Sequence, residues 1–574
     1  MKARIYIVCT QIIVGMFGLL GTSAAIATDY DQLTNLFEDF RQFQEATLHN
    51  GFPDYSNSAV ADKLQGLGEY KEALNNIENS SWPVWQKVDY HLVRAEMNAM
   101  EFQHRIQRPW SRDPGFYSMM GGDAGATINA PKFFEPIFSL LGFSEEGPTM
   151  TEEQRRSSPK LTLDEQHATR SSLLAIPGMY KQARLNLTEA AADFAEFAIR
   201  NLEEDQGVYE ELAERLTKNH PDLASDASRA ASAVHEFREW MLANKDEMAP
   251  YAGLGKKNYD WWMHNVQLSP WGWEDSNRII QSEYNRIITF LKLEEHRNRK
   301  SPNLPVTMSQ KEWADSLRIA LHHVVDFMRD EEIMTVDDWV NPEDYYAYDH
   351  GSASDELDDS LSDEFLPENT SIDTKVRQRE ILPGETHEYI GHMLDYQRQA
   401  VLTKSPIRSA GRRFNMGSMR LEGWAVALEE LLMQAGVLDE RPQRGRIMEY
   451  LMNASHMSLA IPDMKMHANE INLAEARQLC AEIMPRGWSQ EDERMVWFEM
   501  QSNLRNPGGF HSNVVTGKAY FMKLFREAAQ EADTEFVIRD FVDDFLSAGT
   551  IPMSLIRWEM TGNSDDVTLV TEEL

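Results

Sequence analysis

The sequence contains few cysteines: Cys9 and Cys480 are the only two among 574 residues. Cys9 lies in an N-terminal segment that we expect to be removed, so the mature chain would hold one cysteine and no internal disulfide. Hydrophobic residues make up 42% of the chain and aromatic residues 10%, which allows a sizeable core and argues against disorder. Such a core can stabilise a chain of this length without disulfides. Cys480 is therefore interpreted as a small core residue rather than a nucleophile.

Basic residues are also scarce relative to acidic ones. The chain has 56 Lys and Arg residues against 92 Asp and Glu residues, which gives a formal net charge of −36. A surface of this sign repels nucleic acids and anionic membranes, so the composition argues against both as partners. The same charge favours solubility and the binding of cationic ligands or metal ions.

Long apolar runs are missing after the first twenty residues, so no later segment is expected to span a membrane. The N-terminus combines Lys2 and Arg4 with an apolar stretch from Ile5 to Leu20 and the small-residue cleavage pattern Ala25-Ile26-Ala27. This pattern is typical of a cleaved secretory signal peptide, here residues 1–27, and it predicts a secreted or periplasmic protein. An uncleaved membrane anchor is the alternative, but the stretch is short for a span.

Strand-like alternation of apolar and polar residues is nearly absent from the sequence. Apolar residues instead recur at spacings of three and four with charges between them, as in residues 31–50 and 84–106. The sequence therefore predicts an all-α fold, with one large helical domain over residues 28–574 that is either undivided or arranged as two lobes flanking a cleft. Polar segments at residues 145–161 and 349–375 are expected to be loops.

A candidate metal site lies in residues 384–400, where His387 and Glu388 are followed by His392. A hydrolytic zinc centre needs neutral imidazoles, a carboxylate ligand and a base beside the bound water, and a His-Glu pair with a second His on one helix supplies most of these groups. The usual spacing of the histidines is four residues. Here it is five, which separates them by roughly 140° around an undistorted helix. Joint ligation requires a π-bulge or a break, which Gly391 would permit; otherwise the two histidines are unrelated.

A carboxylate about thirty residues after the second histidine is suited to complete this site. Glu422 begins a helical pattern in residues 420–433 that includes Glu429 two turns later. On a neighbouring long helix, Glu422 would be the third ligand of a His-His-Glu site. A surface glutamate is the alternative, but the Gly423-Trp424 pair that follows is unusual for an exposed helix face.

Together, these two segments resemble the motifs of the bacterial family called domain of unknown function 885. That family is largely uncharacterised and is grouped with zinc metallopeptidases, and its motifs look like His-Glu-x-x-Pro-Gly-His and Glu-Gly-Trp-Ala-x-Tyr-x-Glu. The resemblance continues in order over nearly the whole mature chain, including residues 173–187, 253–279 and 461–476. This sequence departs from the family in lacking the proline, in a first motif that is one residue shorter, and in Leu428 where the family has tyrosine.

The resemblance implies a zinc-dependent hydrolase in which His387, His392 and Glu422 bind Zn²⁺. Glu388 would be the general base that takes a proton from the metal-activated water. His467, in a segment that resembles the family's Asp-x-x-x-His segment, is a candidate for polarising the substrate carbonyl or stabilising the oxyanion, with a structural histidine buried in a helix as the alternative.

The predicted function is that of an exported metallopeptidase that cleaves peptide bonds outside the cytoplasm. A catalytically degraded helical binding protein on the same scaffold is the alternative, motivated by the departures in the motifs and in residues 507–514. Asp395, one turn after His392, is a candidate for holding a ligand histidine, with an exposed helix acid as the alternative. A serine or cysteine hydrolase is disfavoured, because the sequence has no Gly-x-Ser-x-Gly element and Cys480 lacks a supporting context.

Overall fold

The structure, a computed structural model, describes most of the chain beyond its N-terminal segment. The predicted signal peptide, residues 1–27, lies outside the described part, as does most of the acidic segment at residues 349–375. The described residues are 29–119, 134–144, 147–148, 157–307, 309–350, 370–403 and 405–572.

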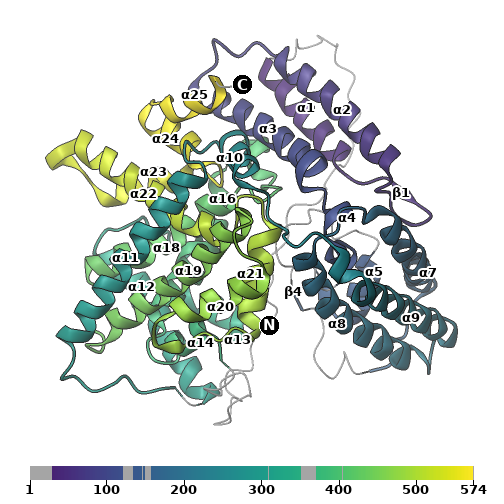
Figure 1. Cartoon of the computed structure of the whole chain (residues 1–574). Coiled ribbons are helices and arrows are strands. Elements are labelled where there is room, and N and C mark those ends of the chain that lie inside the picture. Colours follow the sequence, from purple (N-terminus) through teal and green to yellow (C-terminus); the bar gives the residue numbers. More distant parts are fainter. Residues whose placement is uncertain are drawn as a thin grey trace, which may run out of the picture.

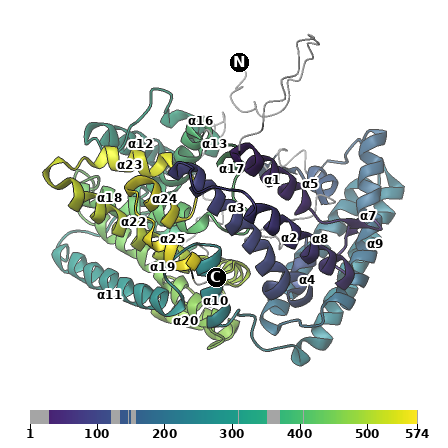
Figure 2. The ribbon, with the colours of Figure 1, turned by 90° about the horizontal axis from the view of Figure 1, so that it is seen from above.

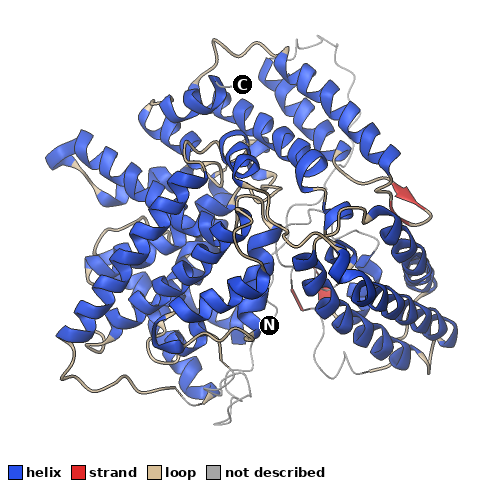
Figure 3. Cartoon of the chain, in the orientation of Figure 1, coloured by secondary structure: helices blue, strands red, loops and turns tan. Residues whose placement is uncertain are grey.

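Helices make up nearly all of the regular structure in these ranges (Figure 3), so the all-α prediction is confirmed. Strands occur as two antiparallel pairs of two residues each. They are β1 (Leu48–His49) with β2 (Phe52–Pro53), and β3 (Phe143–Ser144) with β4 (Gly147–Pro148).

A smaller lobe is formed by three long helices, α7, α8 and α9, and the short elements before them. Figures 1 and 2 both show the three helices together on one side of the molecule. The lobe has an apolar core of its own, which includes Phe134, Tyr180 and Phe237. α7 begins with a capping box, in which the side chains of Thr162 and Glu165 accept each other's backbone amides. The elements are α4 (Pro109–Arg112), η2 (Pro114–Tyr117), α5 (Glu135–Leu141), α7 (Leu163–Asn186), α8 (Ala192–Leu216), α9 (Pro221–Asn244) and η5 (Lys245–Glu247).

The larger body contains the N-terminal helices and the helices described after residue 255. One continuous apolar core runs through it, with Trp262, Trp424 and Tyr520 fully buried. Its elements before residue 350 are α1 (Asp29–Phe43), α2 (Asn57–Asn75), α3 (Val84–Phe102), η1 (Gln103–Gln107), α10 (Lys256–Asn265), α11 (Trp273–Arg297), α12 (Gln310–Asp330) and α13 (Pro342–His350). Its later elements are α14 (Ile372–Arg377), α15 (Leu382–Glu385), η8 (Thr386–Leu394), α16 (Asp395–Leu402), α17 (Pro406–Ser409), α18 (Ser418–Ala435), α19 (Gly445–His467), α20 (Leu473–Ile483), η9 (Pro485–Gly487), α21 (Arg494–Arg505), α22 (His511–Ala532), η10 (Asp533–Glu535), α23 (Ile538–Ser547), α24 (Met553–Thr561) and α25 (Asp565–Glu572).

A third, smaller apolar cluster joins the two parts of the molecule. It packs Phe194 and Phe197 of α8 against side chains of α20 and α21. Cys480 lies in this cluster and is fully buried, as expected for a core residue. The chain is thus a single helical domain with a larger body and a smaller lobe.

The long helices of the larger body are amphipathic, as the spacing of apolar residues predicted. In α12, Leu317, Leu321 and Val324 are buried at helical spacing, while polar residues occupy the other face. Among the described residues, no helix combines the length and the apolar character needed to cross a bilayer.

Candidate metal centre

His387 and His392 lie on η8, which is a π-helix. Backbone hydrogen bonds in a π-helix connect residues five apart, so two residues at that spacing share one face, as residues four apart do in an α-helix. The distortion that the five-residue spacing required is therefore confirmed. The two imidazole rings lie 4.7 Å apart, and their Nε2 atoms are separated by 3.0 Å.

Gly391 has a different role from the one expected. Its φ is not positive, and the π-helix continues through it without a break. A Cβ atom at this position would lie 2.7 Å from Cβ and 2.9 Å from Cα of Ala425, which is closer than side chains pack. Glycine is needed here because η8 packs closely against α18, the helix that carries Glu422.

Glu422 completes a convergent set of three donor atoms. Its Oε2 lies 3.6 Å from Nε2 of His387 and 3.5 Å from Nε2 of His392, and the two nitrogens are 3.0 Å apart. The point equidistant from these three atoms in their plane is about 2.0 Å from each of them, which matches Zn–N and Zn–O distances. Two imidazoles and a carboxylate are also the donor types of catalytic zinc sites. The three predicted ligands therefore fit this ion in both chemistry and spacing.

The Gly-Trp pair after Glu422 is explained by packing. A Cβ atom on Gly423 would lie 2.5 Å from Cα of Gly517, so the backbones of α18 and α22 are in contact where the helices cross. Trp424 is fully buried beside Phe521 in the main core. Both residues anchor the second turn of α18, where Glu422 lies.

Glu429 contacts His387 through Nδ1, the ring nitrogen that does not face His392 and Glu422. Its Oε1 accepts a hydrogen bond from Nδ1 of His387 at 2.7 Å, and its side chain is fully buried. This bond fixes the ring so that Nε2 faces His392 and Glu422, an arrangement usual for ligand histidines of zinc. Glu429 lies two turns after Glu422 in the sequence, and its role becomes evident only from this contact.

The electrostatics of the cluster favour a bound cation. Burial disfavours the charged form of His387, but hydrogen bonds and charges from Glu422 and Glu429 outweigh burial and hold its pKa well above 6.5. Burial would raise the pKa of Glu422, yet its bonds to His387 and His392 hold that pKa well below 4.5. The carboxylates of Glu422 and Glu429 thus both lie beside His387, where each favours a positive charge. A divalent cation bound there would interact favourably with both.

A cavity of 820 Å³ opens beside this cluster, and Glu388 lines it together with the three candidate ligands. The Glu388 side chain is 48% exposed, and its Oε1 lies 3.5 Å from Nη2 of Arg377. The carboxylate therefore has access to water in the same space as the donor atoms, as a general base requires. The residues that line the cavity lie between residues 372 and 514, so it belongs to the larger body and is not a cleft between the lobes.

The cavity wall also contains titratable residues that the sequence analysis did not identify. The ring of His456 stacks between those of His387 and His511, at 6.0 and 6.2 Å. Burial holds the pKa of His456 well below 6.5, lowers that of His511 to about 3, and raises that of Glu499 to about 8. His387, Glu429 and His456 form a second group of potential ligands. Because Nδ1 of His387 is already bonded to Glu429, the group with His392 and Glu422 is the better metal site.

A comparison with family models matches residues 44–560 to the family described as "Bacterial protein of unknown function (DUF885)". The chain belongs to this family. The resemblance drawn from the two motifs is thereby confirmed, and by the family's own description its function is unknown. None of the curated proteins compared with this DUF885 member matches it.

Two solved structures share the fold of this DUF885 chain. A predicted lipoprotein of unknown function from Shewanella oneidensis is 16% identical, with a TM-score of 0.68 over 93% of this chain and 100% of that one. A predicted lipoprotein from Colwellia psychrerythraea is 12% identical, with a TM-score of 0.60 over 96% of this chain and 100% of that one. At these identities the likeness establishes the fold alone.

Two other residues singled out in the sequence lie apart from the donor cluster. His467 is fully buried at the end of α19, where its Nε2 lies 3.0 Å from the carbonyl oxygen of Asn503, and it does not line the cavity. Asp395 forms a buried ion pair with Arg420. The carboxylate that holds a candidate ligand histidine is thus Glu429.

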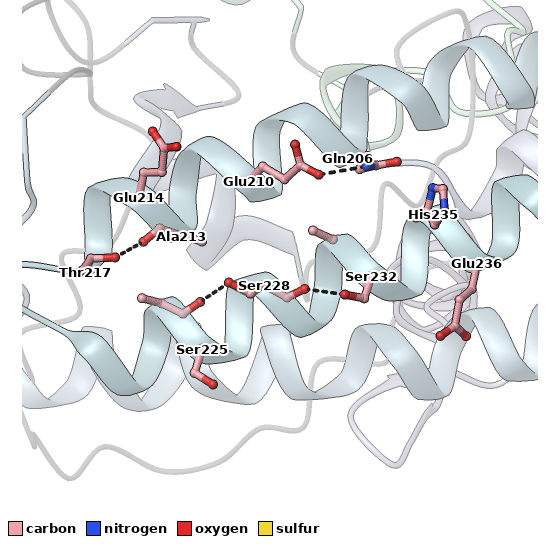
Figure 4. Close-up of a pocket in the computed structure, with 12 residues that line it drawn as sticks. Gln206, Glu210, Ala213, Glu214, Thr217, Ser225, Ser228, Ser232, His235 and Glu236 are labelled. Atoms are coloured by element: carbon pink, nitrogen blue, oxygen red, sulfur yellow. Dashed lines mark hydrogen bonds between the residues drawn. The ribbon is translucent and has the colours of Figure 1, made fainter.

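A second hollow, of 620 Å³, lies between α8 and α9 of the smaller lobe (Figure 4). Three of its hydroxyl groups are bonded to their own helices, since Thr217, Ser228 and Ser232 each donate to the carbonyl oxygen four residues earlier. Its lining contains none of the groups of potential metal ligands in the described residues. Its lining combines small residues with Gln206, Glu210, Glu214, His235 and Glu236.

Proposed function

We propose that the protein is a zinc-dependent hydrolase, and specifically a peptidase that acts outside the cytoplasm. The observation that carries the proposal is the convergence of His387 Nε2, His392 Nε2 and Glu422 Oε2, with mutual distances of 3.0 to 3.6 Å. Three protein ligands and an adjoining cavity are the arrangement of catalytic zinc, whereas structural zinc has four protein ligands.

The chain's own residues supply the remaining parts of a hydrolytic site. Zinc held by three protein ligands lowers the pKa of a bound water to about 7 and polarises a substrate carbonyl. Glu388 would accept the proton of the attacking water and pass it to the leaving amine. Arg377, 3.5 Å from Glu388, holds that carboxylate at the cavity, and Glu429 keeps His387 in the tautomer that presents Nε2.

Peptide substrates and an extracytoplasmic location have separate support. The cavity joins the polar donor cluster to apolar side chains such as Met495, Phe498 and Phe510, which suits a substrate with a polar backbone and apolar side chains. The location is supported by the signal pattern at residues 1–27 and by two relatives in fold that are described as predicted lipoproteins.

The second candidate is a binding protein that has the fold of the hydrolase but has lost catalytic activity. It is favoured by Leu428 in place of the family's tyrosine and by the shortened first motif. In that case substitution of the ligands would leave the binding of a partner and the fold intact.

Metal analysis of the purified mature chain, combined with a Glu388→Gln variant, tests the proposal. We expect about one zinc per chain in both proteins. Hydrolysis of a mixed peptide pool should fall by about 10²- to 10⁴-fold in the variant, as for the loss of a general base. Glu440→Gln, at an exposed position, is the matched control and should retain full activity. Absence of stoichiometric metal, with no effect of Glu388→Gln, would rule out the hydrolase and favour the binding protein.

A further inference from the structure

One carboxylate in the wall of the candidate metal cavity has no positively charged partner. Of the five acidic side chains that line this cavity, two contact Arg377 and two contact the candidate ligand His387. The fifth belongs to Glu499 of α21, and no described lysine or arginine lies within ion-pair distance of it. Burial and the like charge of Glu422 both raise its pKa, so the protein itself does nothing to stabilise a negative charge there.

The side chain that faces Glu499 is His511, and its own hydrogen bonds make it an acceptor. Oδ1 of Asn503 accepts from the backbone amide of His511 and lies 3.0 Å from Nδ1 of the same residue. Because this oxygen is an acceptor, Nδ1 must carry the proton and donate to it. Burial lowers the pKa of His511 to about 3, so the ring is neutral and its Nε2 has a lone pair in place of a proton.

Two acceptors therefore face each other in the cavity wall. Nε2 of His511 and Oε2 of Glu499 are 3.6 Å apart, which is longer than a hydrogen bond. Oε2 has no hydrogen-bond partner in the described part of the chain, and the hydrogen bond of the His511 ring is made by Nδ1. A donor for this pair has to come from outside the protein, and a positively charged donor would also balance the carboxylate.

Both side chains are open to the cavity. They line it, and the side chain of Glu499 is 16% exposed while that of His511 is 4% exposed. Oε2 of Glu499 is enclosed by protein, whereas Oε1 of Glu499 and Nε2 of His511 are not. A ligand in the cavity can therefore contact one oxygen of the carboxylate and the free nitrogen of the imidazole.

A stack of three histidines relates this pair to the metal ligands. The ring centres of His387 and His456 are 6.0 Å apart and those of His456 and His511 are 6.2 Å apart, so His511 lies within about 12 Å of His387. The charge of Glu422 acts on both Glu499 and His511, as expected for groups around one cavity. Extended peptide spans about 3.3–3.6 Å per residue, so a group bound at the pair lies at most about three residues from the metal ligands.

We propose that Glu499 and His511 bind a primary ammonium group of the peptide substrate. This inference rests on the proposed peptidase function. An ammonium group has three N–H donors and a positive charge, so the carboxylate can take one donor and the charge while the imidazole takes a second donor. A neutral imidazole beside the carboxylate suits a cation, because it adds an acceptor without adding a competing charge.

Two parts of a peptide carry this group. If the pair binds the α-ammonium of the N-terminus, the protein is an aminopeptidase that removes about one to three residues. If the pair binds the side chain of a lysine, it selects peptides with lysine close to the scissile bond.

The test is equilibrium dialysis of peptides with the zinc-loaded Glu388→Gln protein, which holds substrate without cleaving it. The probes are three pools of C-terminally amidated tetrapeptides built from uncharged residues. One pool has free N-termini, the second is N-acetylated, and the third is N-acetylated with one lysine at a varied position. We expect the first or the third pool to be retained about tenfold or more above the second, as for hydrogen bonds to charged groups. The preferred pool identifies the source of the ammonium, and equal retention of all three pools would overturn the inference.

A second substitution separates binding at this pair from general attraction of cations to an acidic protein. Added to the Glu388→Gln protein, Glu499→Gln should bring retention of the preferred pool down to that of the neutral pool. Glu491→Gln, at an exposed position, removes the same charge and should keep the preference. An unchanged preference in Glu499→Gln, or an equal loss in Glu491→Gln, would overturn the assignment.

The variant at position 499 replaces an unpaired buried carboxylate with an uncharged amide, so we expect it to fold. Added in the same way, His511→Phe provides an independent test, because it keeps an aromatic ring and removes the Nε2 acceptor. It should lower the preference for the ammonium pool severalfold. If Glu499→Gln fails to fold, an unchanged preference in a folded His511→Phe protein overturns the assignment.

Zinc content measured on the same samples separates this inference from the proposed function. Preference for an ammonium pool without bound zinc would leave the cation site standing and reject the hydrolase. Bound zinc without such a preference would keep the hydrolase and reject the ammonium site.

Discussion

Helix α18 lies between two partly buried clusters of titratable side chains that differ in whether their charges balance. On one side lies the metal cluster, defined as His387, His392, Glu422 and Glu429. On the other side lies the ion-pair cluster, defined as Glu283, Arg286, Glu430 and Lys518. The neighbouring residues Glu429 and Glu430 belong to different clusters, so one turn of one helix serves both.

The ion-pair cluster is neutral within itself. Glu430 accepts from Arg286 and from Lys518, each at 2.6 Å, and Glu283 lies 3.0 Å from Lys518. Two acids and two bases cancel, and each carboxylate has a cation as its partner. Such a cluster fixes how α11, α18 and α22 pack and needs nothing from outside the protein.

The metal cluster is not neutral when its histidines are in the form that binds metal. Two uncharged imidazoles and two carboxylates leave a charge of about −2, which one Zn²⁺ would cancel. Without a bound cation, the carboxylates are offset by the proton that Glu422 and Glu429 favour on His387. The two clusters contain the same number of carboxylates, and they differ in that only the ion-pair cluster contains Arg and Lys partners for them.

The largest expected effect comes from removing a ligand. His392→Ala should reduce zinc from about one per chain to none and abolish peptide hydrolysis, because two remaining ligands do not hold the ion in a catalytic site. Elemental analysis of the purified variant measures this. His296→Ala, in the exposed last turn of α11, is the control and should keep its zinc. Full zinc occupancy in His392→Ala would contradict the assignment of the cluster.

The ion-pair cluster should instead make the free energy of unfolding depend on pH in the acidic range. Burial raises the pKa of Glu283, but hydrogen bonds and charges from Arg286 and Lys518 outweigh burial and hold that pKa at about 2. Because the pKa is lower in the folded state, the ionised carboxylate stabilises the fold above about pH 4.5, and this stability is lost as the pH falls toward 2. The amount is on the order of 3 kcal/mol.

Urea unfolding between pH 6 and pH 3 measures this prediction. The free energy of unfolding should fall more steeply for the native chain than for Glu283→Gln, which has no carboxylate to protonate. Parallel pH profiles for the two proteins would show that Glu283 is not stabilised by its cations.

The smallest expected effect is a change in zinc affinity when one of the adjacent residues Glu429 and Glu430 is substituted. These two substitutions also compare the two clusters most directly. Glu429→Gln should weaken zinc binding by about 10- to 100-fold, since the amide no longer holds His387 as a charged acceptor. Glu430→Gln should leave zinc affinity unchanged and reduce stability. Competition with a chromophoric chelator measures the affinities, and equal loss in both variants would mean that the two clusters are not independent.

Much of the site could be predicted because it follows from local geometry. The five-residue spacing of His387 and His392 required a distorted helix, and η8 has that distortion. Glu429 could also have been found, because it lies seven residues after Glu422 and therefore on the same face of α18. The all-α fold followed from periodicity that extends over the chain.

The remaining features depend on contacts between distant segments. The role of Gly391 depends on Ala425 of another helix, and nothing near Gly391 in the sequence reveals that contact. His456 of α19 stacks on His387 of the metal cluster, and His511 of α22 stacks on His456, but no local motif indicates either contact. The position of His467 likewise depends on tertiary packing, which buries its ring beside the carbonyl oxygen of Asn503.

The contact between Gly423 and Gly517 has a consequence for how the protein tolerates mutation. A methyl group at position 517 would lie 2.9 Å from Cα of Gly423, so even alanine forces α18 and α22 apart. Because Glu422 precedes Gly423, such a shift would displace a donor atom without altering any reactive group. A screen for lost activity should therefore recover substitutions of Gly423 and Gly517 alongside those of the ligands, although neither glycine carries a reactive group.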